Sequence, residues 1–271
     1  MLGKMIDKTR VVAPLVHCIT NYVTVNDCAN ILLACGGSPI MADAAGEVSD
    51  ITSICSALDI NIGTLNERTI ESMVIAGQRS NELSHPVLLD PVGAGASALR
   101  TKTAFELLEK VKFTVIRGNI SEIKTIYKGF GTTKGVDADA NDAVTGAIIA
   151  DVADIAMELA TRKGAIIAIT GEIDIIANSD RAYAIRNGHA MMSKITGTGC
   201  MLSALICALV AANPQWELEA TVAAVCLMGI CGEKAAAAAT GTASFRIALI
   251  DAMSNMDGTE FNKMAKWEEI K

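Results

Sequence analysis

Residues 87–95 read Val-Leu-Leu-Asp-Pro-Val-Gly-Ala-Gly, a short aliphatic run that ends in an acid and a glycine-bearing turn. Runs of the same kind stand at 113–116 and 165–169, each followed by polar residues beside a glycine. Short, wholly apolar runs are typical of strands buried on both faces of a parallel sheet. Because ligands bind beyond the carboxyl ends of such strands, the stretch predicts both the sheet and the edge that carries a site.

Strand-like runs and helical patterns alternate along the first two thirds of the chain. Further strands are expected at Pro39–Met41 and Asp59–Ile62, with helices over 24–33, 67–82, 101–110 and 143–162. Thr24 is expected to cap the first of these helices and Gly36-Gly37 to stop it. This alternation indicates an α/β fold with a mostly parallel central sheet and helices on both faces. We interpret residues 1–271 as a single domain.

The last third of the chain reads differently. Residues 173–177 and 182–186 predict a hairpin, and helices are expected over 200–212, 217–239 and 244–256. The polar stretch 129–142 is expected to be a loop, and its acidic part a solvated surface.

Composition excludes several classes of protein. A net charge of −7 without a basic stripe argues against a nucleic-acid partner. No run of about 18 apolar residues is present, so we expect no membrane association and a cytoplasmic location. Eight cysteines without a CxxC pair indicate reduced core thiols. The 51% hydrophobic content suggests buried subunit interfaces.

The polar residues after the three strand-like runs have the chemistry of a phosphate site. Asp90 and Glu122 are candidate Mg²⁺ ligands, because Mg²⁺ favours a few carboxylates together with substrate phosphates. Arg117 offers positive charge to phosphates and Thr170 a hydroxyl. Two alternatives stay open, in which Asp90 is a turn residue before Pro91 and Glu122 an ordinary acid at a helix start.

The stretch Thr196-Gly197-Thr198-Gly199-Cys200 opens a long apolar helix. Its free first-turn N–H groups and the helix dipole favour an anion such as a transferring phosphoryl group. A helix N-terminus also lowers the pKa of a thiol, so Cys200 is a candidate proton acceptor for an alcohol. In the alternative, Cys200 is a small residue that contacts the substrate.

Several stretches together resemble one known family. They are His17–Val23, Gly37–Ala42, Leu89–Ala94, Arg117–Glu122, Thr170–Glu172 and Ile195–Cys200. In this order and over nearly the whole chain, the sequence resembles the hydroxyethylthiazole kinases, which have the ribokinase-like fold. A late match at 241–245 has Ala243 where the family pattern has glycine.

The resemblance implies transfer of the γ-phosphate of ATP, with Mg²⁺, to 4-methyl-5-(2-hydroxyethyl)thiazole in thiamine salvage. It implies a homotrimer with active sites at subunit interfaces, and it places Cys200 where related sugar kinases carry an aspartate base. It also implies contacts for individual residues. The expected thiazole-side residues are Asn21, Met41, Gly63, Thr64 and Gly197, and the expected nucleotide-side residues are Arg117, Asn119, Thr170 and Gly199.

Three other functions are less consistent with the sequence. A hydroxymethylpyrimidine or sugar kinase of the same fold is the nearest alternative, and Cys200 and the stretch 18–23 speak against it. A nicotinamide-dependent oxidoreductase is disfavoured because neither Gly93-Ala94-Gly95 nor Gly197-Thr198-Gly199 has a third glycine in register. A non-catalytic binding module would require carboxylates displaced from the phosphate site. His17 and His189 fit either a pocket or a structural role.

Overall fold

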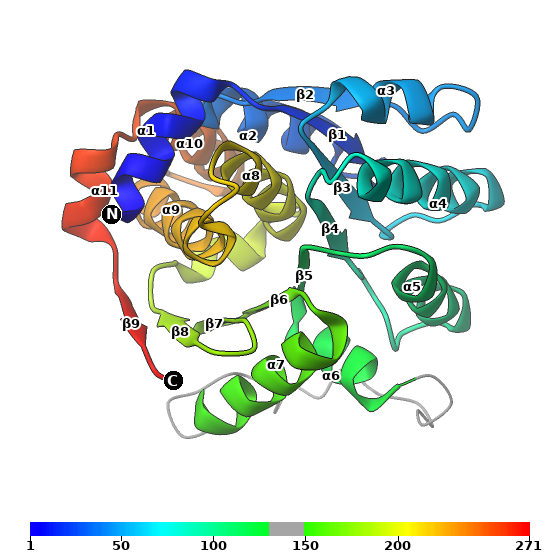
Figure 1. Ribbon diagram of the computed structural model, residues 1–271. Helices are drawn as coiled ribbons and strands as arrows, with labels where there is room; N and C mark the ends of the chain where they lie inside the picture. The colour runs from blue at the N-terminus through cyan, green and yellow to red at the C-terminus, as the bar shows by residue number, and fades with distance from the viewer. Residues whose placement is uncertain (130–148) are drawn as a thin grey trace.

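The computed structural model describes residues 1–129 and 149–271 and is built on one nine-stranded sheet (Figure 1). The strand order is β2-β1-β3-β4-β5-β6-β7-β8-β9, parallel from β2 to β6 and antiparallel from β6 to β9. The strands are β1 Leu15–Ile19, β2 Ser38–Met41, β3 Ala57–Asn61, β4 Val87–Asp90, β5 Val115–Asn119, β6 Ile166–Thr170, β7 Asp174–Ala177, β8 Ala182–Ile185 and β9 Trp267–Glu269. The predicted mostly parallel α/β fold is confirmed.

Helices cover both faces of the sheet and form two separate cores (Figure 1). One face carries α1 Leu2–Val12, α2 Val25–Cys35, α8 Thr198–Ala212, α9 Glu217–Ala238, α10 Thr242–Asn255 and α11 Gly258–Met264. The other carries α3 Val48–Ile54, α4 Glu67–Glu82, α5 Ala98–Lys110, α6 Ile120–Lys128 and α7 Ile149–Lys163. A short 3₁₀ helix spans Ala190–Lys194. Because both faces are covered, the strands read as aliphatic runs rather than as alternating patterns.

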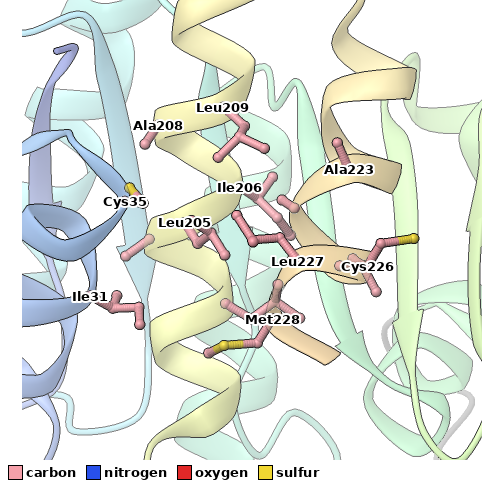
Figure 2. Packing of buried hydrophobic residues seen from close by; sticks show 14 of the residues in the cluster. Ile31, Cys35, Leu205, Ile206, Ala208, Leu209, Ala223, Cys226, Leu227 and Met228 are labelled. Atoms are coloured by element: carbon pink, nitrogen blue, oxygen red, sulfur yellow. The ribbon is translucent and has the colours of Figure 1, made fainter. Parts of the chain in front are cut away.

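The first face is centred on α8, which lies between α2 and α9 (Figure 2). Leu205 and Ile206 of α8 pack with Leu227 and Met228 of α9, and all four side chains are buried. By length and composition α9 would be able to cross a membrane, yet 78% of its most apolar window is buried inside the protein. A helix that is apolar on all sides and buried in this way is a core helix.

Most predicted elements are confirmed to within a few residues, including the hairpin of β7 and β8 and the stop of α2 at Gly36. One cap was wrong. Thr24 is the N-cap residue of α2, but its side chain makes no capping bond and its hydroxyl donates to Asn21 Oδ1 instead, at 3.0 Å. The eight cysteines are free thiols, as expected. The expected loop after Gly129, and the start of the helix expected from residue 143, lie outside the described residues.

Candidate active site

The polar residues that end neighbouring strands form one row at the carboxyl edge of the sheet. Asp90, Asn119 and Thr170 are the last residues of β4, β5 and β6. In the strand register Asn119 lies opposite Thr170, and Asp90 lies opposite Asn61 of β3. The row therefore assembles because these strands are parallel and end together.

The N-terminus of α8 meets this row. Gly197 is its N-cap residue, with a φ of 92° that disfavours any residue with a side chain. A Cβ on Gly199 would lie 2.7 Å from Nη1 of Arg117, so only a glycine lets the guanidinium lie against the first turn. Nη2 of Arg117 donates to Thr170 Oγ1 at 2.6 Å. The structure thus brings Arg117, Thr170 and Gly199 together, as the sequence predicted.

Asp90 is the most deeply placed acid of the site, with no exposed surface. Its Oδ2 accepts from Asn61 Nδ2 and Ser203 Oγ, both at 2.8 Å, and lies 3.5 Å from Arg117 Nη1. Burial raises the pKa of Asp90, and the Arg117 charge and these hydrogen bonds oppose the rise. Within residues 1–129 and 149–271, Oδ1 of Asp90 has no hydrogen-bond partner.

Glu122 is buried at the start of α6, where it completes a capping box. Its Oε1 accepts from the Gly93 N–H and its Oε2 from the Asn119 N–H, both at 2.8 Å. The Asn119 side chain accepts in turn from the Glu122 N–H at 2.9 Å. Burial, followed by the charge of Asp90, raises the pKa of Glu122, against the effect of the two N–H donors. Glu122 therefore acts as an acid at a helix start, which was one of the two alternatives from the sequence. This role is compatible with a second role near a metal ion.

These acids differ in how well they suit a metal ion. The unpartnered, buried Oδ1 of Asp90 fits a cation ligand, whereas both oxygens of Glu122 already accept backbone N–H groups, which favours contact through water. In the part of the chain that the structure describes, no group of three or more His, Cys, Asp or Glu residues is arranged to hold a metal by itself. Such a site suits an ion that arrives with phosphates rather than a resident one.

Cys200 lies in the first turn of α8 and is half-buried. Its Sγ accepts from Asn21 Nδ2 at 3.2 Å and from Asn61 Nδ2 at 3.3 Å. The expectation of a lowered thiol pKa was wrong. Burial and then the nearby charge of Asp90 raise the pKa of Cys200, and they outweigh the hydrogen bonds from Thr24 and Asn21 and the charge of Arg117.

The residues expected on the thiazole side lie next to Cys200, with one exception. Gly63 packs against Asn21, since a Cβ on Gly63 would lie 3.0 Å from that of Asn21. The Tyr22 N–H donates to Thr64 Oγ1 at 3.2 Å, which ties the same two loops together. Gly197 faces Thr24, again with no room for a side chain. Met41 is the last residue of β2, the edge strand beyond β1, and it packs against the core of the first face.

A cleft of about 710 Å³ opens beside Arg117, Thr170 and Gly199. Its other walls are residues that the sequence did not assign to a ligand, apart from His189, for which a pocket role was one of two alternatives. They include Glu172, Asp174, Asn187, Gly188, His189, Met192, Leu202, Val225, Met228 and Gly229. A cleft of this size accommodates a nucleotide-sized ligand whose phosphates reach the N-terminus of α8.

Two residues inside the site were also missed. Asn61 ends β3 just as Asp90 ends β4, so the same strand-end signal would have found it. Ser203 follows Cys200 by one turn of an apolar helix and gave no signal.

The two histidines considered from the sequence differ in their roles. His17 is structural, because its ring nitrogens bond Thr52 Oγ1 and the Ala42 carbonyl at 2.9 Å, whereas His189 lines the cleft.

The order of the strands and the helices on both faces define the class of fold. A ribokinase-like superfamily protein from Enterococcus faecalis superposes with a TM-score of 0.62 at 12% identity, over 93% of each chain, which shows the fold. The protein therefore has the ribokinase-like α/β fold, and the glycine-bearing N-terminus of α8 faces buried carboxylates.

The sequence places the protein within that class. It matches the hydroxyethylthiazole kinase family over residues 6–259. A hydroxyethylthiazole kinase from Clostridium acetobutylicum is 59% identical, with 99% of both chains covered. The structure of the hydroxyethylthiazole kinase protein from Pyrococcus horikoshii superposes with a TM-score of 0.88 at 34% identity, over 100% of this chain and 99% of that one. The chain belongs to the hydroxyethylthiazole kinase family, and the expected kinase class is confirmed.

Proposed function

We propose that the protein transfers the γ-phosphoryl group of ATP to the hydroxyl of 4-methyl-5-(2-hydroxyethyl)thiazole, a step of thiamine salvage. The observation that carries the proposal is the convergence of Cys200, Asp90 and Arg117 at the start of α8, beside a nucleotide-sized cleft. In the reaction the alcohol oxygen attacks the γ-phosphorus, the bond to ADP breaks, and the hydroxyl proton leaves.

The nucleotide side is assigned to the residues around the cleft. Arg117 lies against the first turn of α8, so its guanidinium and the first N–H groups of that helix face the same volume. Both kinds of donor stabilise charge on phosphate oxygens. Nε of Arg117 is buried without a partner among the described residues, which leaves a donor for such a ligand. Thr170 orients the guanidinium, and Asn119 holds the strand end beside it.

Mg²⁺ is part of the proposal, with Asp90 as its protein ligand and Glu122 behind a water molecule. When bound with ATP, the ion neutralises charge that develops on the phosphates. Asp90 is prepared for this role because its Oδ2 is fixed by Asn61 and Ser203 while its Oδ1 is left without a partner.

Two roles fit Cys200. As a thiolate it would accept the proton of the attacking hydroxyl, but its raised pKa keeps the thiol neutral at rest. As a thiol it would orient the alcohol, and the proton would leave late, which agrees with a loose transition state in which positioning and charge stabilisation dominate. The pair Cys200→Asp and Cys200→Ala, developed below, separates these roles.

Assembly and location are also proposals. Tyr22 and Val23 are 80% and 57% exposed and directly follow Asn21, so an apolar surface borders the alcohol side of the site. A homotrimer that covers this surface would complete the site at a subunit interface. Light scattering should then give about 85 kDa, three times 28.3 kDa. A cytoplasmic location would be tested by cell fractionation.

The reaction is tested with purified protein, Mg-ATP and the thiazole alcohol, with mass spectrometry of the phosphate ester as the readout. Parallel samples receive hydroxymethylpyrimidine or ribose, the acceptors of the nearest alternative kinases. We expect the thiazole ester and at most traces of the other two products. Phosphorylation of either other acceptor with a higher kcat/KM would overturn the substrate assignment.

A further inference from the structure

The side chain of Asn61 stands at the centre of the site and makes four hydrogen bonds. Its Nδ2 donates to Asp90 Oδ2 at 2.8 Å and to Cys200 Sγ at 3.3 Å. Its Oδ1 accepts from the Gly63 N–H at 2.9 Å and from Asn21 Nδ2 at 3.0 Å. A carboxamide offers two N–H donors and two acceptor lone pairs, so all of its capacity is used within the protein.

The orientation of this amide is fixed by its neighbours. If Nδ2 and Oδ1 exchanged places, the oxygen would face the Asp90 carboxylate and the NH₂ group would face the Gly63 N–H. An acceptor would then face an acceptor and a donor would face a donor. The surrounding hydrogen bonds therefore fix which atom of the amide is Nδ2 and which is Oδ1. Asn61 has no exposed surface, and it therefore acts through its neighbours rather than on a ligand.

These four bonds join the two halves of the site. In the proposed function, Gly63 and Asn21 belong to the loops of the alcohol side, whereas Asp90 and Cys200 lie where the phosphoryl group is transferred. We propose that Asn61 is a positioning residue that holds the sulfur of Cys200 and the carboxylate of Asp90 in register with the loops that receive the alcohol. This inference rests on the proposed function, because it concerns the alignment of that alcohol with the phosphoryl group.

The two hydrogen bonds to Sγ also orient the side chain of Cys200. Sγ of Cys200 accepts from two amides, Asn21 and Asn61, that approach from the β1 and β3 side. A thiol that accepts two N–H groups there uses both lone pairs of its sulfur and directs its S–H hydrogen elsewhere, which restricts the side chain to one rotamer. Loss of Asn61 would remove one of the hydrogen bonds that hold Cys200 and one of those that hold Asp90, and a misplacement of about 1 Å is enough to lower turnover roughly 100-fold.

The test is a double-mutant cycle between Asn61→Ala and Cys200→Ala, with kcat and both KM values measured for the wild type and each variant. We expect Asn61→Ala to lower kcat roughly 100-fold while the KM for ATP changes less than about threefold, since Asn61 does not line the cleft. We also expect the double variant to lose at least about tenfold less than the product of the single losses, because the two residues act as a unit.

The matched control is Asn213→Ala. Asn213 is also a buried asparagine, but its amide donates to the Leu209 and Met5 carbonyls at the far end of α8. Melting temperatures are recorded for all variants, and we expect Asn213→Ala to be destabilised with kcat within about twofold of the wild type. A purely structural role for Asn61 would make the two variants behave alike.

Three results would overturn the proposal: a kcat for Asn61→Ala within about threefold of the wild type, losses that multiply in the double variant, or a change confined to KM. If Asn61→Ala does not fold, Asn61→Asp replaces it, since it keeps the shape and the acceptor for Gly63 while removing the NH₂ group shared by Asp90 and Cys200. The same loss of kcat is then expected, and near-normal turnover rejects the inference. No turnover by the wild-type enzyme would instead reject the proposed function, and this inference with it.

Discussion

Asp59 provides the sharpest test of the electrostatics beneath the active site. It lies on β3 two residues before Asn61, has no exposed surface, and neither of its carboxylate oxygens has a hydrogen-bond partner in the described part of the protein. Burial, and then the charge of Asp90, raise the pKa of Asp59 well above its usual value, and Arg117 opposes them only in part. We therefore expect Asp59 to be protonated in the folded protein at neutral pH.

The effect on stability follows from proton linkage. Above pH 4 the unfolded chain releases the proton of Asp59, whereas the folded protein retains it. The folded state then binds one proton more, so the free energy of unfolding falls as the pH rises, until the pH reaches the folded pKa. One proton changes the unfolding equilibrium about tenfold per pH unit, or roughly 3 kcal/mol between pH 5 and pH 7.

The test is urea unfolding of the wild type and Asp59→Asn at pH 5, 6 and 7, at one protein concentration. Asparagine does not titrate, so we expect the variant to gain roughly 3 kcal/mol relative to the wild type between pH 5 and pH 7. Any cost of burying an unpaired amide is the same at each pH and cancels from this difference. A stability difference that stays constant with pH would refute the protonated state of Asp59.

Substitutions at three positions address the residues placed at the reacting groups. Cys200→Asp should preserve or raise kcat, whereas Cys200→Ala should lower it at least about tenfold; near-complete inactivation of the aspartate variant would argue against proton acceptance. Glu122→Gln should raise the Mg²⁺ concentration needed for half-maximal turnover much more than the KM for the thiazole, and an unchanged Mg²⁺ titration would remove Glu122 from the metal site. Gly197→Val should abolish measurable thiazole binding in calorimetry, because a Cβ at a φ of 92° lies 2.8 Å from Thr24 Cγ2; undiminished affinity would exclude Gly197 from the pocket.

Much of the fold could be predicted from local pattern, because buried parallel strands and their covering helices each have a distinct period. The runs before Asp90, Arg117 and Thr170 identified three neighbouring strands and the edge where they end. Elements held by tertiary contacts gave no such signal. Strand β9 is a fully exposed three-residue strand that exists because it pairs with β8, and its sequence alone does not require it.

The sequence predicted the site residues whose type alone indicates a role. It did not predict properties that depend on neighbours brought together by the fold. The glycines at 197 and 199 indicated that another group lies close to the backbone there. The structure shows that these groups are the side chains of Thr24 and Arg117. The pKa of Cys200 could not be foreseen, because it depends first on the burial of Cys200 itself and then on the charge of Asp90, which is far away in the sequence but close in space. Asn61 was missed because the strand expected over 59–62 extends one residue beyond the true end of β3, and because its four partners come from four separate segments.

The position of α8 has a consequence for how the chain is made. All the parallel strands, β1 to β6, precede residue 171, but the helix that covers β1, β3 and β4 on one face begins at residue 198. On the ribosome roughly 2 to 8 s more, at usual rates of synthesis, must therefore pass after the last parallel strand is made before the covering helix has been added. Throughout that interval the apolar side chains of Val16, Leu88 and Val115 lack their final neighbours. We expect the yield of native enzyme in cells to depend on protection of the nascent chain during this delay more than on the stability of the finished protein.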